Sequence, residues 1–198
     1  QHRLNKIEDL ERVSSQINGC EVDLRSDVKK NGQIHLSHDP WSLGDDFEQW
    51  LVCYKKKSLS GPLILNTKED GLEKRVIELM SRYKISNYFF LDTTIPTLVK
   101  YLETPAAKHF SVRVSKFESP LTSRHLVDRA GWIWLDCFDG VPMTLGQLHG
   151  VELKKICLVS PEIQVAGAPV TEEFVQLGRK CAAICTKVPD VWKVFVSN

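Results

Sequence analysis

The sequence has almost no net charge and no long apolar run. Its 26 basic and 25 acidic residues leave a formal net charge of +1 at pH 7, so no overall field draws the chain to nucleic acid or to an anionic membrane. No apolar run approaches the roughly 18 residues of a membrane-spanning helix, and no secretory signal is recognisable. We therefore expect a cytoplasmic protein with no nucleic-acid partner and no transmembrane segment, and we infer no protein partner. Any attraction to phosphate must be local to a site.

The cysteine pattern lacks the marks of a metal or redox motif. None of the six cysteines forms a CxxC pair, and none has a histidine at zinc-binding spacing. Four of them lie inside apolar, strand-like runs, where a cysteine behaves as a small buried hydrophobe. The pattern predicts reduced, structural thiols. The six are Cys20, Cys53, Cys137, Cys157, Cys181 and Cys185.

Internal repeats and low-complexity tracts are also absent, and short apolar runs instead alternate with amphipathic stretches. The predicted strands are Cys20–Arg25, Pro62–Lys68, Asn87–Asp92, Phe110–Ser115, Gly131–Cys137, Lys155–Ser160 and Ala182–Thr186. The predicted helices are Ile7–Ser14, Asp45–Lys55, Gly71–Tyr83, Thr94–Leu102, Pro120–Arg129 and Thr171–Cys181.

Strict alternation of strand and helix indicates parallel strands joined by crossover helices. Seven strands are visible, and an eighth would lie just before His2, so we expect the first strand to be truncated or very short. The sequence predicts an α/β fold, a compact (β/α)8 TIM barrel that occupies residues 1–198 as a single domain. An open doubly wound sheet is the alternative architecture.

Active sites of such barrels lie at the carboxyl ends of the strands, and polar residues gather there. Alternation along the first predicted strand places Glu21 and Asp23 on the face opposite Val22 and Leu24. Two acids in a barrel lumen repel each other unless a cation or a proton lies between them. By the same alternation, further polar side chains point inward on later strands: Asn66, Lys68, Arg113 and Asp136, with Asp92 at a strand end.

Two histidines are expected at the same end of the barrel. A turn at residues 29–33 precedes a hairpin-like excursion that brings His38 back over the barrel mouth, and His2 and Arg3 follow the expected first strand. Carboxylates for a hard cation, cationic groups for a phosphate and imidazoles for proton transfer are what a phosphodiesterase needs.

The same residues carry a family resemblance. His2-Arg3, Glu21-x-Asp23 and His38-Asp39 resemble, in order and spacing, the glycerophosphodiester phosphodiesterase family of the PI-PLC-like phosphodiesterases. The run from Ile184 to Asp190 is similar to the family's closing strand. The runs His2-Arg3-Leu4-Asn5 and Leu65-Asn66-Thr67-Lys68 resemble the sphingomyelinase D branch.

The resemblance implies a role for each residue. It implies a phosphoric diester hydrolase, or a lyase that forms a cyclic phosphate, acting on a glycerophosphodiester or a related phospholipid-type diester. It makes His2 and His38 the acid–base pair, and it makes Glu21, Asp23 and Asn66 the ligands of one Mg²⁺ or Ca²⁺. Lys68 matches a phosphate-contacting lysine, and Arg3 and Arg113 are further candidates for the phosphate. Asn66 stands where the family has a third acid, for which Asp92 or Asp136 would substitute, and Leu4 stands where the family has glycine.

Several alternatives stay open. Glu21 and Asp23 are ion partners of Lys68 and Arg113 in a metal-free interpretation, and Arg113 pairs with Asp136 in another. Asn66 is then a hydrogen-bonded lumen amide. In function, the alternatives are a catalytically impaired barrel that binds phosphorylated ligands, and a sugar-phosphate isomerase or aldolase with Lys68 as its Schiff-base residue. Trp132 and Trp134 suit barrel packing, and Trp41 suits the substrate entrance.

Overall fold

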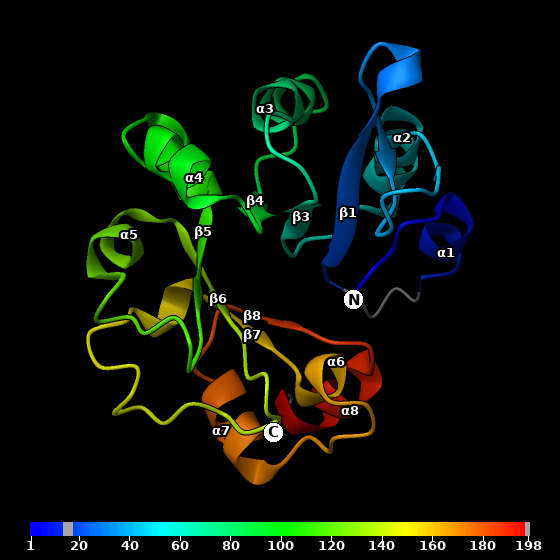
Figure 1. Cartoon of the computed structure of the whole chain (residues 1–198). Helices are drawn as coiled ribbons and strands as arrows, with labels where there is room; N and C mark the ends of the chain where they lie inside the picture. The colour runs from blue at the N-terminus through cyan, green and yellow to red at the C-terminus, as the bar shows by residue number, and fades with distance from the viewer. Residues whose placement is uncertain (14–17, 197–198) are drawn as a thin grey trace. The chain divides into compact units, whose positions relative to one another are not determined.

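Strands and helices alternate along the chain as the apolar pattern predicts. A computed structural model describes residues 1–13 and 18–196, and its elements are coloured in chain order in Figure 1. The strands are β1 (Cys20–Asp27), β2 (Gln33–Leu36), β3 (Leu63–Thr67), β4 (Tyr88–Leu91), β5 (Ser111–Val114), β6 (Trp132–Leu135), β7 (Ile156–Val159) and β8 (Ala183–Cys185). The α-helices are α1 (Ile7–Arg12), α2 (Phe47–Lys57), α3 (Glu73–Arg82), α4 (Ile95–Leu102), α5 (Arg124–Arg129), α6 (Pro161–Gln164), α7 (Glu172–Gly178) and α8 (Pro189–Val196), and the 3₁₀ helices are η1 (Val28–Lys30), η2 (Pro105–His109) and η3 (Leu153–Lys155).

All seven strands predicted from the sequence are present. Six are one or two residues shorter at each end than predicted, because the residues that bound the runs, several of them polar or glycine, lie outside the ladders. β1 is two residues longer than predicted. The six predicted helices are also present, although α5 begins only at Arg124 after a series of turns. Ser14, the predicted end of the first helix, lies outside the described residues. Two further helices, α6 and α8, were not predicted. α6 has only four residues, and α8 begins at Pro189, inside the run from Ile184 to Asp190 that was matched to a closing strand.

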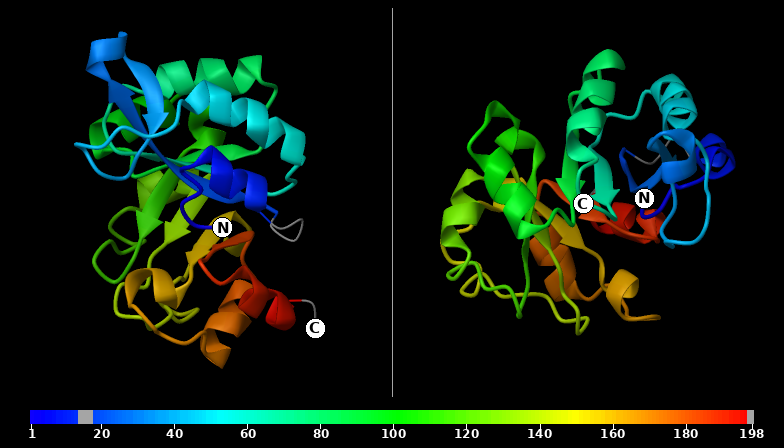
Figure 2. Two further views of the ribbon diagram at one scale, coloured as in Figure 1. Left: turned by 90° about the vertical axis from the view of Figure 1, so that its right-hand side faces the viewer. Right: turned by 45° about the horizontal axis from the view of Figure 1, so that its top comes forward.

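The strands form two four-stranded sheets in the described residues, in the orders β2-β1-β3-β4 and β5-β6-β7-β8. Every neighbouring pair is parallel except β1 and β2, which form the predicted hairpin. Figure 2 shows this hairpin with η1 at its tip. No strand precedes β1 in the described residues. Instead, the N-terminal segment makes a backbone hydrogen bond to β1, from Leu4 N to Glu21 O at 2.9 Å. The α/β class with parallel strands is confirmed.

The chain divides into two compact units, each with a core of its own. One comprises His2–Leu98, and the other begins at Val99 and takes in Gln1. In the first, strand residues such as Val22, Leu65 and Phe89 are buried. Arg82 donates to Glu48 at 3.0 Å, which joins α3 to α2. In the second, strand residues such as Val114 and Ile133 are buried.

The prediction of reduced, structural cysteines is confirmed. All six thiols are free, and Cys20, Cys137, Cys157 and Cys185 are buried. Burial raises the pKa of Cys20 to about 12, so its thiolate is scarce near neutral pH and the thiol is inert.

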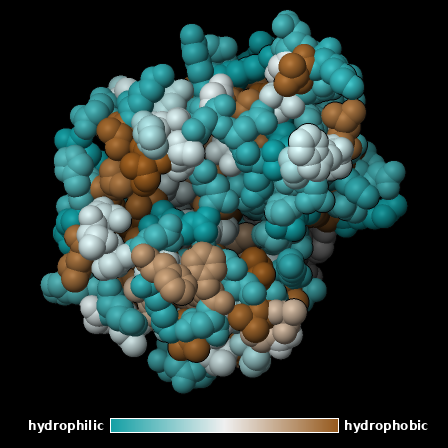
Figure 3. All heavy atoms as spheres, in the orientation of Figure 1, coloured by the Kyte–Doolittle hydropathy of each residue, from teal (hydrophilic) through white to brown (hydrophobic). Residues whose placement is uncertain are grey.

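The surface carries polar side chains with scattered apolar ones between them, as Figure 3 shows for one face. Among the described helices, none combines the length and the apolar character that crossing a bilayer requires.

Candidate functional site

Two buried carboxylates on β1 form the centre of the site, which lies within the unit His2–Leu98. Glu21 and Asp23 are almost inaccessible to solvent. Their strand is buried on both faces from Cys20 to Leu24, so the pleat encloses both acids instead of exposing one side to water. Buried carboxylates need partners that replace water, and the neighbouring segments supply them.

Glu21 receives hydrogen bonds from two directions. Asn66 Nδ2 donates to Glu21 Oε1 at 3.0 Å, and the backbone N–H of Arg3 donates to Oε2 at 2.9 Å. Arg3 has the left-handed φ of 56° that directs this N–H at the carboxylate. Burial, followed by the charge of Asp23, raises the pKa of Glu21 to about 7, and the bond from Asn66 works against that rise. Glu21 therefore holds a proton more readily than an ordinary glutamate.

Asp23 is surrounded by nitrogen donors. Asn5 Nδ2 donates to Asp23 Oδ2 at 2.7 Å, and Asn5 Oδ1 accepts from Asp23 N at 2.9 Å. Lys68 Nζ lies 3.1 Å from Asp23 Oδ1, and Arg3 Nε lies 3.7 Å from Oδ2. The sequence analysis assigned no role to Asn5, because hydrophobic periodicity does not mark it. The one signal that could have found it is its place in the run from His2 to Asn5.

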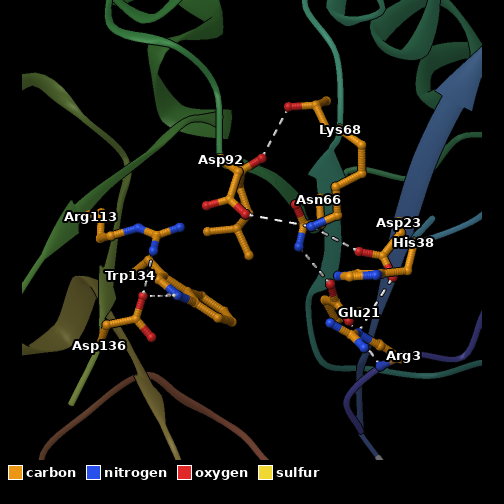
Figure 4. A network of polar contacts seen from close by, with 12 residues as sticks. Arg3, Glu21, Asp23, His38, Asn66, Lys68, Asp92, Arg113, Trp134 and Asp136 are labelled. Atoms are coloured by element: carbon orange, nitrogen blue, oxygen red, sulfur yellow. Dashed lines mark hydrogen bonds and ion pairs between the residues drawn. The ribbon is translucent and has the colours of Figure 1, made fainter. Parts of the chain in front are cut away.

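Lys68 joins the ends of two strands. β3 places Asn66 opposite Asp23 in the parallel register, and Lys68 follows two residues later. Its ammonium also lies 3.7 Å from Asp92 Oδ2, just after β4, as Figure 4 shows. Asp92 takes a left-handed φ of 61°, which turns the chain sharply at this strand end. Parallel strands therefore bring Asp23, Asn66, Lys68 and Asp92 together, as the alternation predicted.

The two histidines have different surroundings. The side chain of His2 is 9% exposed, and its Nε2 lies 3.8 Å from Glu21 Oε2. His38 is 43% exposed, and its Nδ1 lies 2.9 Å from Asp39 Oδ1. The bond to His38 holds the pKa of Asp39 below its usual range. Ser37 N donates to Asp23 O at 3.1 Å, which anchors the residue before His38 to the carboxylate strand.

The oxygen set resembles one for a hard cation, with two weaknesses. Asn66 Oδ1 is buried and accepts no hydrogen bond from the described residues. Asp23 Oδ1 is also buried, with the Lys68 ammonium 3.1 Å away. Oxygen donors of this kind suit Mg²⁺ or Ca²⁺. However, no group of three His, Cys, Asp or Glu side chains in the described residues could hold a metal ion. The set therefore depends on the neutral oxygen of Asn66, and Lys68 competes for Asp23. The residues fit a weakly bound divalent cation.

Arg113 and Asp136, the other predicted inward pair, lie in the second unit. Arg113 Nη1 is 3.0 Å from Asp136 Oδ2, and Trp134 Nε1 donates to the same oxygen at 3.0 Å. Gln164 donates to the other oxygen. Burial raises the pKa of Asp136, and the Arg113 guanidinium opposes this. The structure thus favours the alternative in which these two residues pair. Trp134 is buried, as expected of a packing residue, and it also donates a hydrogen bond to Asp136. Nothing in the sequence pattern predicted that Gln164 would contact Asp136.

The comparisons with known proteins identify the fold. No protein-family model matches the chain, and no curated protein matches it. Among solved structures, a protein described as a glycerophosphodiester phosphodiesterase from Galdieria sulphuraria is similar with a TM-score of 0.68 and 17% identity, over 98% of this chain and 91% of that one. The glycerophosphodiester phosphodiesterase from Agrobacterium tumefaciens is similar with a TM-score of 0.62 and 12% identity, over 98% and 97%. This chain therefore shares its fold with glycerophosphodiester phosphodiesterases, which confirms at the level of the fold the resemblance stated from its motifs.

Proposed function

We propose that the protein is a phosphoric diester hydrolase that cleaves a glycerophosphodiester or a related phospholipid-type diester. One observation carries the proposal: three motifs of the family resemblance, at residues 2–5, 21–23 and 65–68, each contribute side chains to one cluster around two buried carboxylates. Glu21, Asp23, Asn66 and Lys68 are joined by direct contacts, and His2 and Arg3 reach the same carboxylates. A fold alone hosts many functions, so the proposal rests on this site.

One Mg²⁺ or Ca²⁺ would be held by oxygens of Glu21, Asp23 and Asn66. When bound, such a cation polarises phosphoryl oxygens and offsets the charge that builds in the transition state. The support is the buried Asn66 Oδ1, which accepts no hydrogen bond from the described residues, together with the buried Asp23 Oδ1, which has the Lys68 ammonium 3.1 Å away. The Asn66 amide is neutral, so we propose weaker binding than at a site with three carboxylates.

Cationic side chains would bind the phosphate. Lys68 lies between Asp23 and Asp92, and Arg3 lies beside Asp23 with its side chain 43% exposed, so both border the carboxylate cluster. Arg113, whose guanidinium also pairs with Asp136 at 3.0 Å, is proposed in the same role.

His2 and His38 would transfer the protons. The contact with Asp39 favours the His38 tautomer with a proton on Nδ1, which leaves Nε2 as an acceptor for a proton from the nucleophile. His2 would then protonate the leaving oxygen. The nucleophile is either water, which gives hydrolysis, or a hydroxyl of the substrate, which gives a cyclic phosphate.

The closed eight-stranded barrel and the single domain over residues 1–198 stay predictions.

A second candidate is a barrel that binds phosphorylated ligands without turning them over. The observation in its favour is that Lys68 already neutralises Asp23 while Asn66 already hydrogen-bonds Glu21, so the carboxylates have partners without a metal. The aldolase alternative has less support, because contacts with two carboxylates suit an ammonium better than a nucleophilic amine.

A substrate screen tests the proposal. Glycerophosphodiesters, lysophospholipids and cyclic nucleotides are each incubated with the protein, with added Mg²⁺ or Ca²⁺ and with EDTA, and Glu21→Gln serves as the control. We expect turnover of a glycerophosphodiester or lysophospholipid that falls at least about a hundredfold in the control, the lower scale for loss of a positioned catalytic group. Absence of turnover together with phosphate-ester binding would favour the second candidate.

A further inference from the structure

The segment of residues 39–45 joins β2 to α2, comes directly after His38 and carries an unusual surface. Trp41 is 96% exposed and Leu43 is 72% exposed. The four other tryptophans, at 50, 132, 134 and 192, are buried or half-buried. A tryptophan almost fully in water beside a candidate site is notable, because its large apolar ring is ordinarily buried to a high degree.

Hydrogen bonds hold the segment in its outward position. At its start, Ser37 Oγ lies 2.6 Å from Ser42 Oγ and donates to Asp39 O at 2.9 Å. At its end, Asp45 O accepts from Leu36 N at 2.9 Å, and Asp45 Oδ2 accepts from Ile7 N at 2.6 Å. The loop is therefore closed at its base, and the two apolar side chains project from a defined turn.

The charges at this base are few and mostly acidic. Arg25 Nη2 donates to His38 O at 3.0 Å, and His38 pairs with Asp39. Segment 39–45 itself carries two carboxylates, Asp39 and Asp45, and no lysine or arginine, and the whole chain carries +1. Such a surface has no electrostatic preference for anionic lipid, which is bound through clusters of Lys and Arg. A tryptophan prefers the polar–apolar boundary of a bilayer, where its ring is buried and its N–H stays hydrated.

We propose that segment 39–45 docks on a zwitterionic lipid surface, with Trp41 and Leu43 inserted at the boundary between headgroups and acyl chains. Docking there brings the surface next to His38. The inference rests on the proposed function and deepens it, because it names the substrate class as a phosphodiester carried in a lipid aggregate instead of one free in solution.

Vesicle flotation tests the docking without any need for turnover. Unmodified protein, Trp41→Ala, Leu43→Ala and the matched control Leu121→Ala are mixed with phosphatidylcholine vesicles; Leu121 is 73% exposed and lies in the other unit. We expect the partition coefficient to fall about tenfold in Trp41→Ala and about threefold in Leu43→Ala, the scale for losing one inserted apolar side chain. The partition coefficient of the control should match that of the unmodified protein. Raising the NaCl concentration tenfold should change the partition coefficient of the unmodified protein less than twofold.

A second measurement guards against a folding defect in the variants. In the unmodified protein without vesicles, acrylamide should quench the emission of Trp41, because its indole is exposed. When vesicles of brominated phosphatidylcholine are added, the bromine atoms should quench the same emission. Turnover of a water-soluble diester should be the same in Leu43→Ala as in the unmodified protein, while turnover of a vesicle-borne diester falls with the partition coefficient.

Several results would overturn the inference. One is that the unmodified protein stays in the vesicle-free fraction at millimolar lipid. Another is that Leu121→Ala weakens binding as much as Leu43→Ala does. Sedimentation velocity that shows self-association lost in Trp41→Ala would assign the segment to a second copy of the chain. An equal loss of activity on the soluble diester would assign Trp41 to the substrate entrance. If no diester is turned over but vesicle binding depends on Trp41, the docking stands and the proposed function fails.

Discussion

At the scale of single residues, the site is a set of charges that compensate one another at close range. Glu21 is satisfied by Asn66 and Arg3, and Asp23 by Asn5 and Lys68. Each acid has been taken out of water, so replacing any partner leaves an uncompensated buried group. The effects of substitutions here therefore depend on whether a cation is bound.

Asn66→Asp should change metal affinity and stability in opposite directions. A third carboxylate strengthens the oxygen set, so calorimetry should show Ca²⁺ or Mg²⁺ binding at least about tenfold tighter, with Glu21→Gln abolishing the signal. In EDTA the same variant loses the bond to Glu21 and adds a like charge, which should lower the free energy of unfolding by about 1–3 kcal/mol. Unchanged affinity would remove Asn66 from the site.

The histidines should act in one step. His2→Ala and His38→Ala should each lower kcat/KM by about 10²–10⁴, and the double variant should be little worse than either, because the two proton transfers are concerted. Metal affinity should survive in all three variants, since neither imidazole is a proposed ligand. Activity that persists within about threefold in one single variant would show that its histidine is not the acid or the base.

Glu21 should give the metal-free protein a distinct pH dependence. Its pKa is raised from 4.5 to about 7 on folding, so the folded state binds a proton that the unfolded state releases. The stabilisation is fully present below pH 4.5 and is lost as the pH rises through about 7. Urea unfolding in EDTA should show a fall of order 1–3 kcal/mol across this window. Glu21→Gln should remove this slope, while the exposed control Glu8→Gln should retain it.

At the scale of elements, the β1–β2 hairpin and the turn into α2 position His38 and segment 39–45. Leu36 ends β2, and its carbonyl lies so close to Gly44 that an added Cβ would stand 1.6 Å from the oxygen. The contact is with backbone, which cannot move aside without breaking the bond from Leu36 N to Asp45 O. A glycine is required here for space.

Gly44→Ala should therefore destabilise the protein. We expect a loss of at least about 2 kcal/mol in the free energy of unfolding, on the scale of an overpacked buried position, together with weaker activity because His38 is displaced. Gly146→Ala is the control, since its added Cβ would meet only Thr144 Oγ1 at 3.8 Å. Equal stabilities of the two variants in urea unfolding would contradict this account of the turn.

At the scale of the whole molecule, the open question is cooperativity. Each of the two units has its own sheet and its own buried apolar residues, yet the strict alternation of strand and helix predicts a single domain. All the proposed metal ligands lie in the unit His2–Leu98, whereas Arg113 lies in the other.

We predict one cooperative unfolding transition that bound metal shifts as a whole. Circular dichroism and tryptophan fluorescence should give coincident curves, and Ca²⁺ at about 100 times its Kd should stabilise the protein by about 2.7 kcal/mol. Two transitions, of which only one responds to Ca²⁺, would instead show two independent domains.

Hydrophobic pattern alone predicts the seven parallel strands, most of the helices and the place of the polar residues at the strand ends. Alternation placed Glu21 and Asp23 on one face of β1, and parallel pairing required the ends of β3 and β4 to lie beside them, because neighbouring parallel strands share a carboxyl edge. Apolar runs marked all seven parallel strands, since strands enclosed by helices are continuously hydrophobic.

The contacts between individual polar groups emerge only from the three-dimensional arrangement of the chain. The partners of Asp23 include Asn5 from the N-terminal segment, and Arg3 reaches Glu21 through its backbone N–H and not its side chain. The pairing of Arg113 with Asp136 was one of two open alternatives. These contacts depend on side-chain direction and on backbone angles such as the left-handed φ of Arg3, which hydrophobic periodicity does not encode, because periodicity records burial and not the identity of a polar neighbour.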